Sequence, residues 1–273
     1  MKFMKLAETL RRDQSALVKS AYERLRDCIS DEFQPGYFNS DEVLAAEANG
    51  LSVCDAVLGH ILASPPNVEG EIRARALLNR VAEALVPSEM ENQCHNLHGA
   101  CTLMLDALGV PVVMVVGSVY ATDERGRAFW MNRLVPPAFP GHNPGHAWLL
   151  TPWWRVADLA LLHQFGVAGD YDEMNRSLRP IITVDTNETL EPEVDWWRFE
   201  GRFRLPAEGF AATTKYHDLI GWSQLKLGAT TVRYLPSALT LPAEAELKDV
   251  SVKIGGLSPK EFFDANVSDL LET

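Results

Sequence analysis

Three residues in the middle of the chain carry the side chains of a thiol-dependent catalytic triad, in the order Cys94, His146 and Asp158. A cysteine thiolate is a strong nucleophile, a histidine can move its proton, and a carboxylate can fix the orientation of the imidazole. Such a triad attacks acyl carbons and forms a thioester. The sequence therefore predicts a cysteine enzyme with Cys94 as nucleophile, His146 as base and then acid, and Asp158 as the orienting group.

The residues after Cys94 predict a helix whose first turn contains the thiol. Apolar or small residues recur every three or four positions, and Gly109 and Pro111 end the pattern. The free N–H groups and the dipole at a helix start favour thiolate over thiol, and the same N–H groups can receive an oxyanion. Gln93 and Asn92, directly before the thiol, are the candidate side-chain donors to that oxyanion.

The other two triad residues fall in segments that predict strands. Residues 145–151 and 153–160 are short apolar segments joined by a tight turn, so they predict a hairpin that brings His146 and Asp158 within hydrogen-bonding reach. A run of β-branched residues over 110–120 predicts a buried central strand.

Five short elements of this region occur in one order: Cys94, Gly109-Val110-Pro111, Val115-Val116-Gly117, His146-Ala147-Trp148 and Trp154-Arg-Val-Ala-Asp158. Together they resemble the transglutaminase-like branch of the papain-like cysteine enzymes, over about a quarter of the chain. One departure is that Asn92-Gln93 replaces the Gly-x that often precedes the nucleophile, which leaves the side-chain donor to the oxyanion unassigned.

The resemblance implies an α+β fold, with a papain/transglutaminase-like core and a helical N-terminal part packed on an antiparallel sheet. It implies hydrolysis of a peptide or amide through a thioester, by a protease, amidase or deamidase. The alternatives are acyl transfer or protein cross-linking by a transglutaminase, and a catalytically silent binding module with the same fold. The Arg-Gly-Gly-x-Cys motif of arylamine N-acetyltransferases and the paired zinc-ligand cysteines of peptide N-glycanases are missing.

The predicted helix also carries two competing interpretations. Cys101 is the alternative nucleophile, but it lies on the apolar stripe in the middle of the helix, where cysteine behaves as a small hydrophobic residue. Cys94, His98 and Cys101 stand four and then three positions apart, so they form a possible metal site if a distant ligand such as His142 completes it. Our interpretation is a thiol catalyst that needs no metal and no cofactor.

Four residues near the triad are candidate substrate contacts. Residues 121–144 form a long connection that carries Trp130 and His142, and such loops often form a lid or a pocket wall. His98 lies one turn after the nucleophile, and Trp148 follows the predicted catalytic histidine. Large aromatic residues in a strand pair are more often part of the core, so core packing is the favoured role of Trp148, and His98 either packs one turn below Cys94 or contacts substrate.

Composition narrows the class of partner. The chain has 273 residues, is 47% hydrophobic and has a net charge of −12, which argues against nucleic acid and anionic membranes as partners. Four unevenly spaced cysteines do not form a disulfide framework, and a thiol catalyst suits the cytoplasm. We therefore expect a peptide, protein or small amide substrate, and the oligomeric state stays open.

The remaining patterns predict three regions, or one continuous domain. The first, 1–88, is helical, and residues 89–190 form the transglutaminase-like catalytic core. The third, 191–273, is a β-rich extension that ends in a helix. Specific predictions are an amphipathic N-terminal helix over 6–29 in place of a signal peptide, helices over 41–48, 53–63 and 68–86, strands over 196–204, 229–235 and 247–254, and a capping box at Ser258 and Glu261.

Overall fold

A computed structural model describes residues 33–48, 50, 52–63, 67–86, 90, 93–126, 128–131, 145–164, 180–185, 223–242 and 246–271. The predicted helix over 6–29, the predicted strand over 196–204 and most of the connection 121–144 lie outside these ranges. In the described ranges, no helix is long and apolar enough to cross a membrane.

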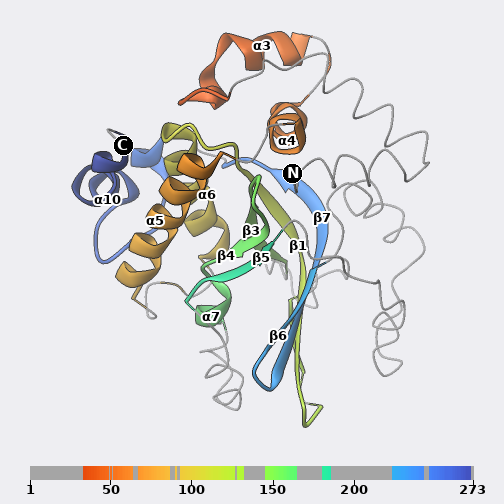
Figure 1. Ribbon diagram of the computed structural model, residues 1–273. Helices are drawn as coiled ribbons and strands as arrows, with labels where there is room; N and C mark the ends of the chain where they lie inside the picture. Colours follow the sequence, from red (N-terminus) through yellow and green to blue (C-terminus); the bar gives the residue numbers. More distant parts are fainter. Residues whose placement is uncertain are drawn as a thin grey trace.

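The described chain is an α+β arrangement of helices around one antiparallel sheet (Figure 1). The α-helices are α3 (Asp41–Ala48), α4 (Val53–Ala63), α5 (Val68–Ala84), α6 (Cys94–Ala107), α7 (Leu161–Gln164) and α10 (Pro259–Asn266). Short 3-10 helices are η1 (Tyr37–Asn39), η5 (Leu247–Asp249) and η6 (Ser268–Leu271). The strands are β1 (Val113–Asp123), β2 (Ala128–Met131), β3 (His146–Leu150), β4 (Trp154–Asp158), β5 (Ile182–Asp185), β6 (Ser223–Leu227) and β7 (Thr230–Thr240).

The sheet has the strand order β5-β4-β3-β1-β7-β6, and β2 pairs with the far end of β1. All the strand pairs in it are antiparallel. β1 is the central strand, paired with β3 on one side and with β7 on the other, and its residues from Val113 to Ala121 are buried. The outermost strands β5 and β6 also contact each other, so the sheet is strongly curved and nearly closed. The predicted strand over 229–235 is thus confirmed, and it lies beside the centre of the sheet.

Two hydrophobic clusters cover the two faces of the sheet. One cluster joins η1, α3 and α4 to one face of β1 and β3, and it includes Trp148 and Tyr234. The other joins α5, α6 and α10 to the opposite face. The centre of the sheet, β1 and β3, is therefore covered on both faces, as in a layered α+β domain, while Thr183 and Asp185 of β5 are exposed.

Helix α6 follows the predicted pattern. Leu97, Cys101 and Met104 of its apolar stripe are fully buried, and Cys94 at its start is partly buried. Gly109 ends the helix with a left-handed φ of 68°, and the N–H of Val110 donates back to Leu105. The predicted helix and its stop are therefore confirmed.

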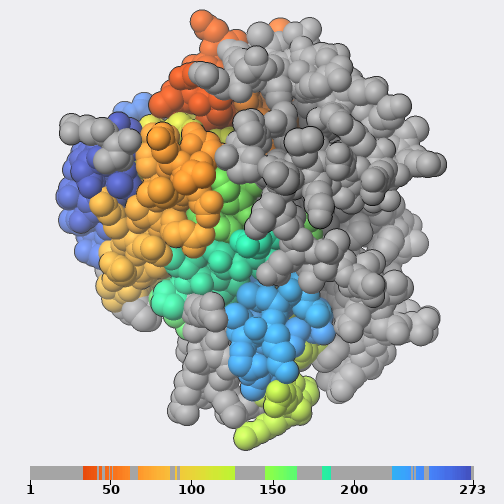
Figure 2. Space-filling model, in the orientation of Figure 1, coloured from red at the N-terminus to blue at the C-terminus, as the bar shows by residue number. Residues whose placement is uncertain are grey.

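Helices α5 and α10 lie side by side on one flank of the molecule, as both views show (Figures 1 and 2). Arg80 of α5 donates to both carboxylate oxygens of Asp269 in η6, at 2.5 and 2.9 Å, and to the carbonyl of Asn266. The predicted capping box is confirmed, since Ser258 and Glu261 exchange hydrogen bonds at the start of α10. This flank holds the C-terminal segment against the helix that precedes α6.

The predicted strand over 247–254 is wrong. Leu247–Asp249 form η5, and Ile254 makes only an isolated bridge to Leu257. Val250, Val252 and Ile254 still alternate as buried residues because they pack in the cluster around α6. The alternation that predicts a strand therefore reflects packing of an extended segment on a helix, without a partner strand.

Asp106, near the end of α6, should make stability depend on pH. Burial raises the pKa of its carboxyl group to about 7, although the backbone N–H groups of Tyr37 and Phe38 oppose this shift. Its Oδ1 atom has no hydrogen-bond partner among the described residues. Between pH 4 and 7 the folded state thus keeps a proton that the unfolded state has lost, so stability falls as pH rises.

Asp106→Asn should therefore stabilise the protein by about 1–3 kcal/mol at pH 8, and by less at pH 5. The amide oxygen can still accept the N–H groups of η1, and the residue no longer has to ionise. Urea unfolding at the two pH values measures the difference. An equal gain at both pH values would contradict the assigned ionisation.

Candidate active site

Cys94 is the first residue of α6, where backbone N–H groups lack helical partners. Its side chain is partly buried and packs at the edge of the cluster around α6. Burial raises the pKa of the thiol. The hydrogen bond and the charge of His146, together with a backbone hydrogen bond from Ala147, lower it by more, so the net pKa lies below the ordinary value. The local environment therefore favours a thiolate.

His146 begins β3 and is buried between the thiol and a carboxylate. Its Nε2–H donates to Asp158 Oδ2 at 2.7 Å. Nδ1 has no nitrogen or oxygen partner among the described residues, and Cys94 is the group that interacts with the ring from that side. Burial lowers the pKa of the imidazolium, but Asp158 and the thiol raise it to about 10. The ring is therefore set to hold a proton between the two anions.

Asp158 ends β4 and uses both carboxylate oxygens. Oδ2 accepts from His146, and Oδ1 accepts from the backbone N–H groups of Ala160 and Leu161 at 2.9 and 3.1 Å. These last two hydrogen bonds lie at the start of α7. Burial raises its pKa, but the charge and hydrogen bond of His146 hold the pKa down at about 2. Asp158 is therefore a buried carboxylate that stays ionised.

The hydrogen bond predicted across the hairpin is present, although the two residues do not face each other directly. Leu149 pairs with Ala157, and continuing this register places Asp158 opposite Trp148. His146 is thus a diagonal neighbour on the same face, a separation that long side chains can span. The turn is held by Thr151, whose hydroxyl accepts the N–H group of Trp154.

Tyr234 completes the site, and sequence reasoning missed it. Its hydroxyl donates to Asp158 Oδ2 at 2.8 Å, the same oxygen that accepts from His146. The residue lies on β7, 76 positions from Asp158. Its only signal in the sequence is its place in a predicted strand, because no local pattern shows that this strand pairs with β1.

His98 has a structural role in this arrangement. Its Nδ1–H donates to the carbonyl of Cys94 at 2.7 Å, and its Nε2 accepts the N–H group of Leu159 at 3.1 Å. Burial lowers its pKa to about 4, so the ring is neutral and ties the start of α6 to the end of β4. Neither nitrogen is left for a substrate or a metal, which corrects the prediction of His98 as a substrate contact.

The alternative roles of Cys101 find no support in its surroundings. It is fully buried, and burial raises its thiol pKa to about 12, so it stays protonated. In the part of the chain that the structure describes, no three His, Cys, Asp or Glu side chains are grouped to hold a metal ion.

Trp148 has the core role that the sequence favours, since only 1% of it is exposed, and this corrects its prediction as a candidate substrate contact. Its ring stacks near His146, with centroids 6.5 Å apart, and meets the ring of Tyr234 edge to face at 5.2 Å. It packs behind the triad and does not face a substrate. Of the other candidates, Trp130 lies in β2 with only its backbone described, and His142 and Asn92 lie outside the described residues.

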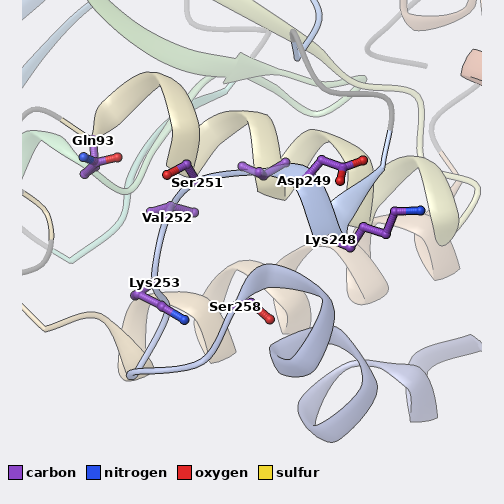
Figure 3. Close-up of a pocket in the computed structure, with 8 residues that line it drawn as sticks. Gln93, Lys248, Asp249, Ser251, Val252, Lys253 and Ser258 are labelled. Carbon is purple, nitrogen blue, oxygen red and sulfur yellow. The ribbon is translucent and has the colours of Figure 1, made fainter.

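Gln93 lines a surface groove of about 570 Å³ directly beside the start of α6 (Figure 3). Its Oε1 accepts from the side-chain amide of Asn96, which also donates to the carbonyl of Ser251. The other lining residues come from η5, from the segment after it and from the start of α10: Lys248, Asp249, Val250, Ser251, Val252, Lys253 and Ser258. The groove is open and partly polar, and its lining includes Gln93, the residue directly before Cys94 in the sequence.

This arrangement has the groups that one kind of chemistry needs. A thiolate can attack an electrophilic carbon while the neighbouring imidazolium gives a proton to the group that leaves. The backbone N–H groups at the start of α6 can receive negative charge on an oxygen. Comparison of the chain with protein-family models, curated proteins and solved structures gave no match.

Proposed function

We propose that this chain is a cysteine hydrolase that cleaves a peptide or amide bond through a thioester. The observation that carries the proposal is the contact series from the partly buried Cys94 to the buried His146 and Asp158, with a 2.7 Å hydrogen bond at its second step. A depressed thiol pKa next to a raised imidazolium pKa is the electrostatic signature of a thiolate–imidazolium pair.

In the first half of the reaction, the Cys94 sulfur attacks the carbonyl carbon and the C–N bond breaks. His146 gives its proton to the departing nitrogen, so an amine leaves and a thioester remains. In the second half, water attacks the thioester and gives a proton to His146. The C–S bond breaks, and the acid and the original ion pair are restored.

The fold supports a papain/transglutaminase-like core as part of this proposal. The nucleophile starts a helix that packs on an antiparallel sheet, and the histidine and the carboxylate follow on two adjacent strands, β3 and β4. This is the order and placement of the triad that the resemblance implies, and it rests on the geometry of the chain itself.

The groove beside Gln93 supports a peptide or protein segment as the substrate. It is open to solvent, and its lining includes the segment 250–253 with Lys253, together with Lys248 of η5 (Figure 3). An extended chain in such a groove would bring an acyl group to the start of α6. Water as the second substrate gives hydrolysis, and an amine in its place gives the transferase alternative.

The proposal is tested by incubating the purified protein with a peptide library, with and without a small primary amine, and following products by mass spectrometry. Hydrolysis gives two fragments or a deamidated peptide, whereas amine incorporation would show a transferase. Iodoacetamide at pH 6 should label Cys94 much faster than it labels the cysteine of an unfolded control peptide. No product together with slow labelling of Cys94 would favour the silent binding module.

A further inference from the structure

Tyr234 lies in the middle of β7, opposite Val119 of the central strand β1. Its side chain projects from the same face as Trp148, and both belong to one hydrophobic cluster. β1 and β3 separate β7 from β4, the strand of Asp158. In a flat sheet that separation would be about 14 Å, at roughly 4.8 Å for each strand, so the tyrosine reaches the carboxylate because the sheet is curved.

Gly117 of β1 lies on the route between them. It is the register partner of His146 on β3, and on the other side it pairs with Pro236, two residues after Tyr234. Register partners project from the same face of a sheet, so a side chain at this position would stand beside His146. Because Gly117 has no side chain, no β1 side chain stands at this position between Tyr234 and His146.

The hydrogen-bond roles at Asp158 Oδ2 are fixed by charge. The carboxylate is ionised and can only accept, so His146 Nε2–H and the Tyr234 hydroxyl both donate to it. Burial, together with the charge of Asp158, raises the pKa of the phenol well above its ordinary value, so the hydroxyl keeps its proton. The oxygen therefore divides its negative charge between two donors.

We propose that Tyr234 is a positioning residue that sets how strongly His146 holds its proton. The inference rests on the proposed function and adds a residue from the C-terminal third to it. Without the tyrosine donor, the full charge of Asp158 Oδ2 would act on the imidazolium and make it a weaker acid. With the donor, the imidazolium gives up its proton more readily, which matters when the leaving group is an amine.

The test is Tyr234→Phe, which removes the hydroxyl and keeps the ring against Trp148. We expect hydrolysis of an amide substrate to fall by up to about three- to ten-fold, because expulsion of an amine needs the imidazolium proton and the donor becomes a weaker acid. An activated ester with the same acyl group needs little proton donation to its leaving group, so its acylation rate should change less than about two-fold. NMR titration of His146 should show a pKa raised by about 0.5–1 unit.

Tyr37→Phe is the matched control, since Tyr37 is also a buried tyrosine but lies in η1 beside His60, on the helices that cover the sheet. It should leave the amide-to-ester ratio and the His146 titration unchanged. The inference is overturned if Tyr234→Phe keeps the wild-type ratio and the wild-type His146 pKa. Failure of the proposed function looks different: the wild-type protein would then hydrolyse neither substrate, while the His146 titration would still report on Tyr234.

Discussion

Cys94→Ala should abolish turnover, with a loss of about 10⁴-fold or more, while the protein keeps its fold. Without the sulfur there is no atom to form the thioester, and the remaining groups can only orient water. The thiol is partly buried at the start of α6, so its removal should cost little stability. Initial rates on an amide substrate, with thermal unfolding as a check on the fold, measure both effects.

Cys101→Ala is the matched control on the same helix. Cys101 is fully buried with a thiol pKa of about 12, so it is protonated and unreactive at neutral pH. Its replacement should keep most of the activity and lower the free energy of unfolding by about 1–2 kcal/mol through the small cavity left behind. If the two variants showed the reverse pattern, Cys101 would be the nucleophile and the assignment at the start of α6 would be wrong.

Asp158→Asn should have the second-largest effect, a loss of about 10²–10⁴-fold in kcat/KM. An amide oxygen can replace Oδ1 and accept the hydrogen bonds from the N–H groups of Ala160 and Leu161. The NH2 group then takes the place of Oδ2, which accepts from His146 in the wild-type protein. A donor at that place favours the tautomer with hydrogen on Nδ1, and Nδ1 is then unable to take a proton from the thiol. The rate of Cys94 alkylation at pH 6 should fall as well.

The same substitution should also lower stability, by about 1–3 kcal/mol, because buried donors lose a charged acceptor. Rates must therefore be measured well below the unfolding temperature. Asp185→Asn is the control, since Asp185 is an exposed carboxylate on the adjacent strand β5. Full activity of Asp158→Asn in folded protein would remove Asp158 from the triad and leave it as the residue that starts α7.

Local patterns in the sequence were enough to predict the elements that carry the triad. The start and stop of α6 depend on nearby residues, since Gly109 and Pro111 act on the helix that precedes them. The hairpin of β3 and β4 has a short turn, so its two strands pair with each other and bring His146 to Asp158. Short-range chemistry decides both features.

The sequence did not predict the features that depend on distant pairing. β7 follows its partner strand β1 by more than a hundred residues, so nothing near Tyr234 reveals that its hydroxyl reaches Asp158. The hydrogen bonds that occupy both ring nitrogens of His98 also depend on a distant segment, because one of them comes from the backbone of Leu159. Segment 247–254 was predicted to be a strand and is not one, because alternating burial is typical both of a strand and of an extended segment packed on a helix such as α6.

The distance along the chain between β1 and β7 also sets when the site is completed during synthesis. A nascent chain that has reached β5 already contains Cys94, His146 and Asp158, but one edge of β1 still lacks its partner strand and Asp158 lacks the tyrosine. Pairings between distant segments form late because a long loop must close first. We therefore expect the ribosome-bound chain to carry a poorly organised thiol, and the reactive thiolate to arise only in the finished protein.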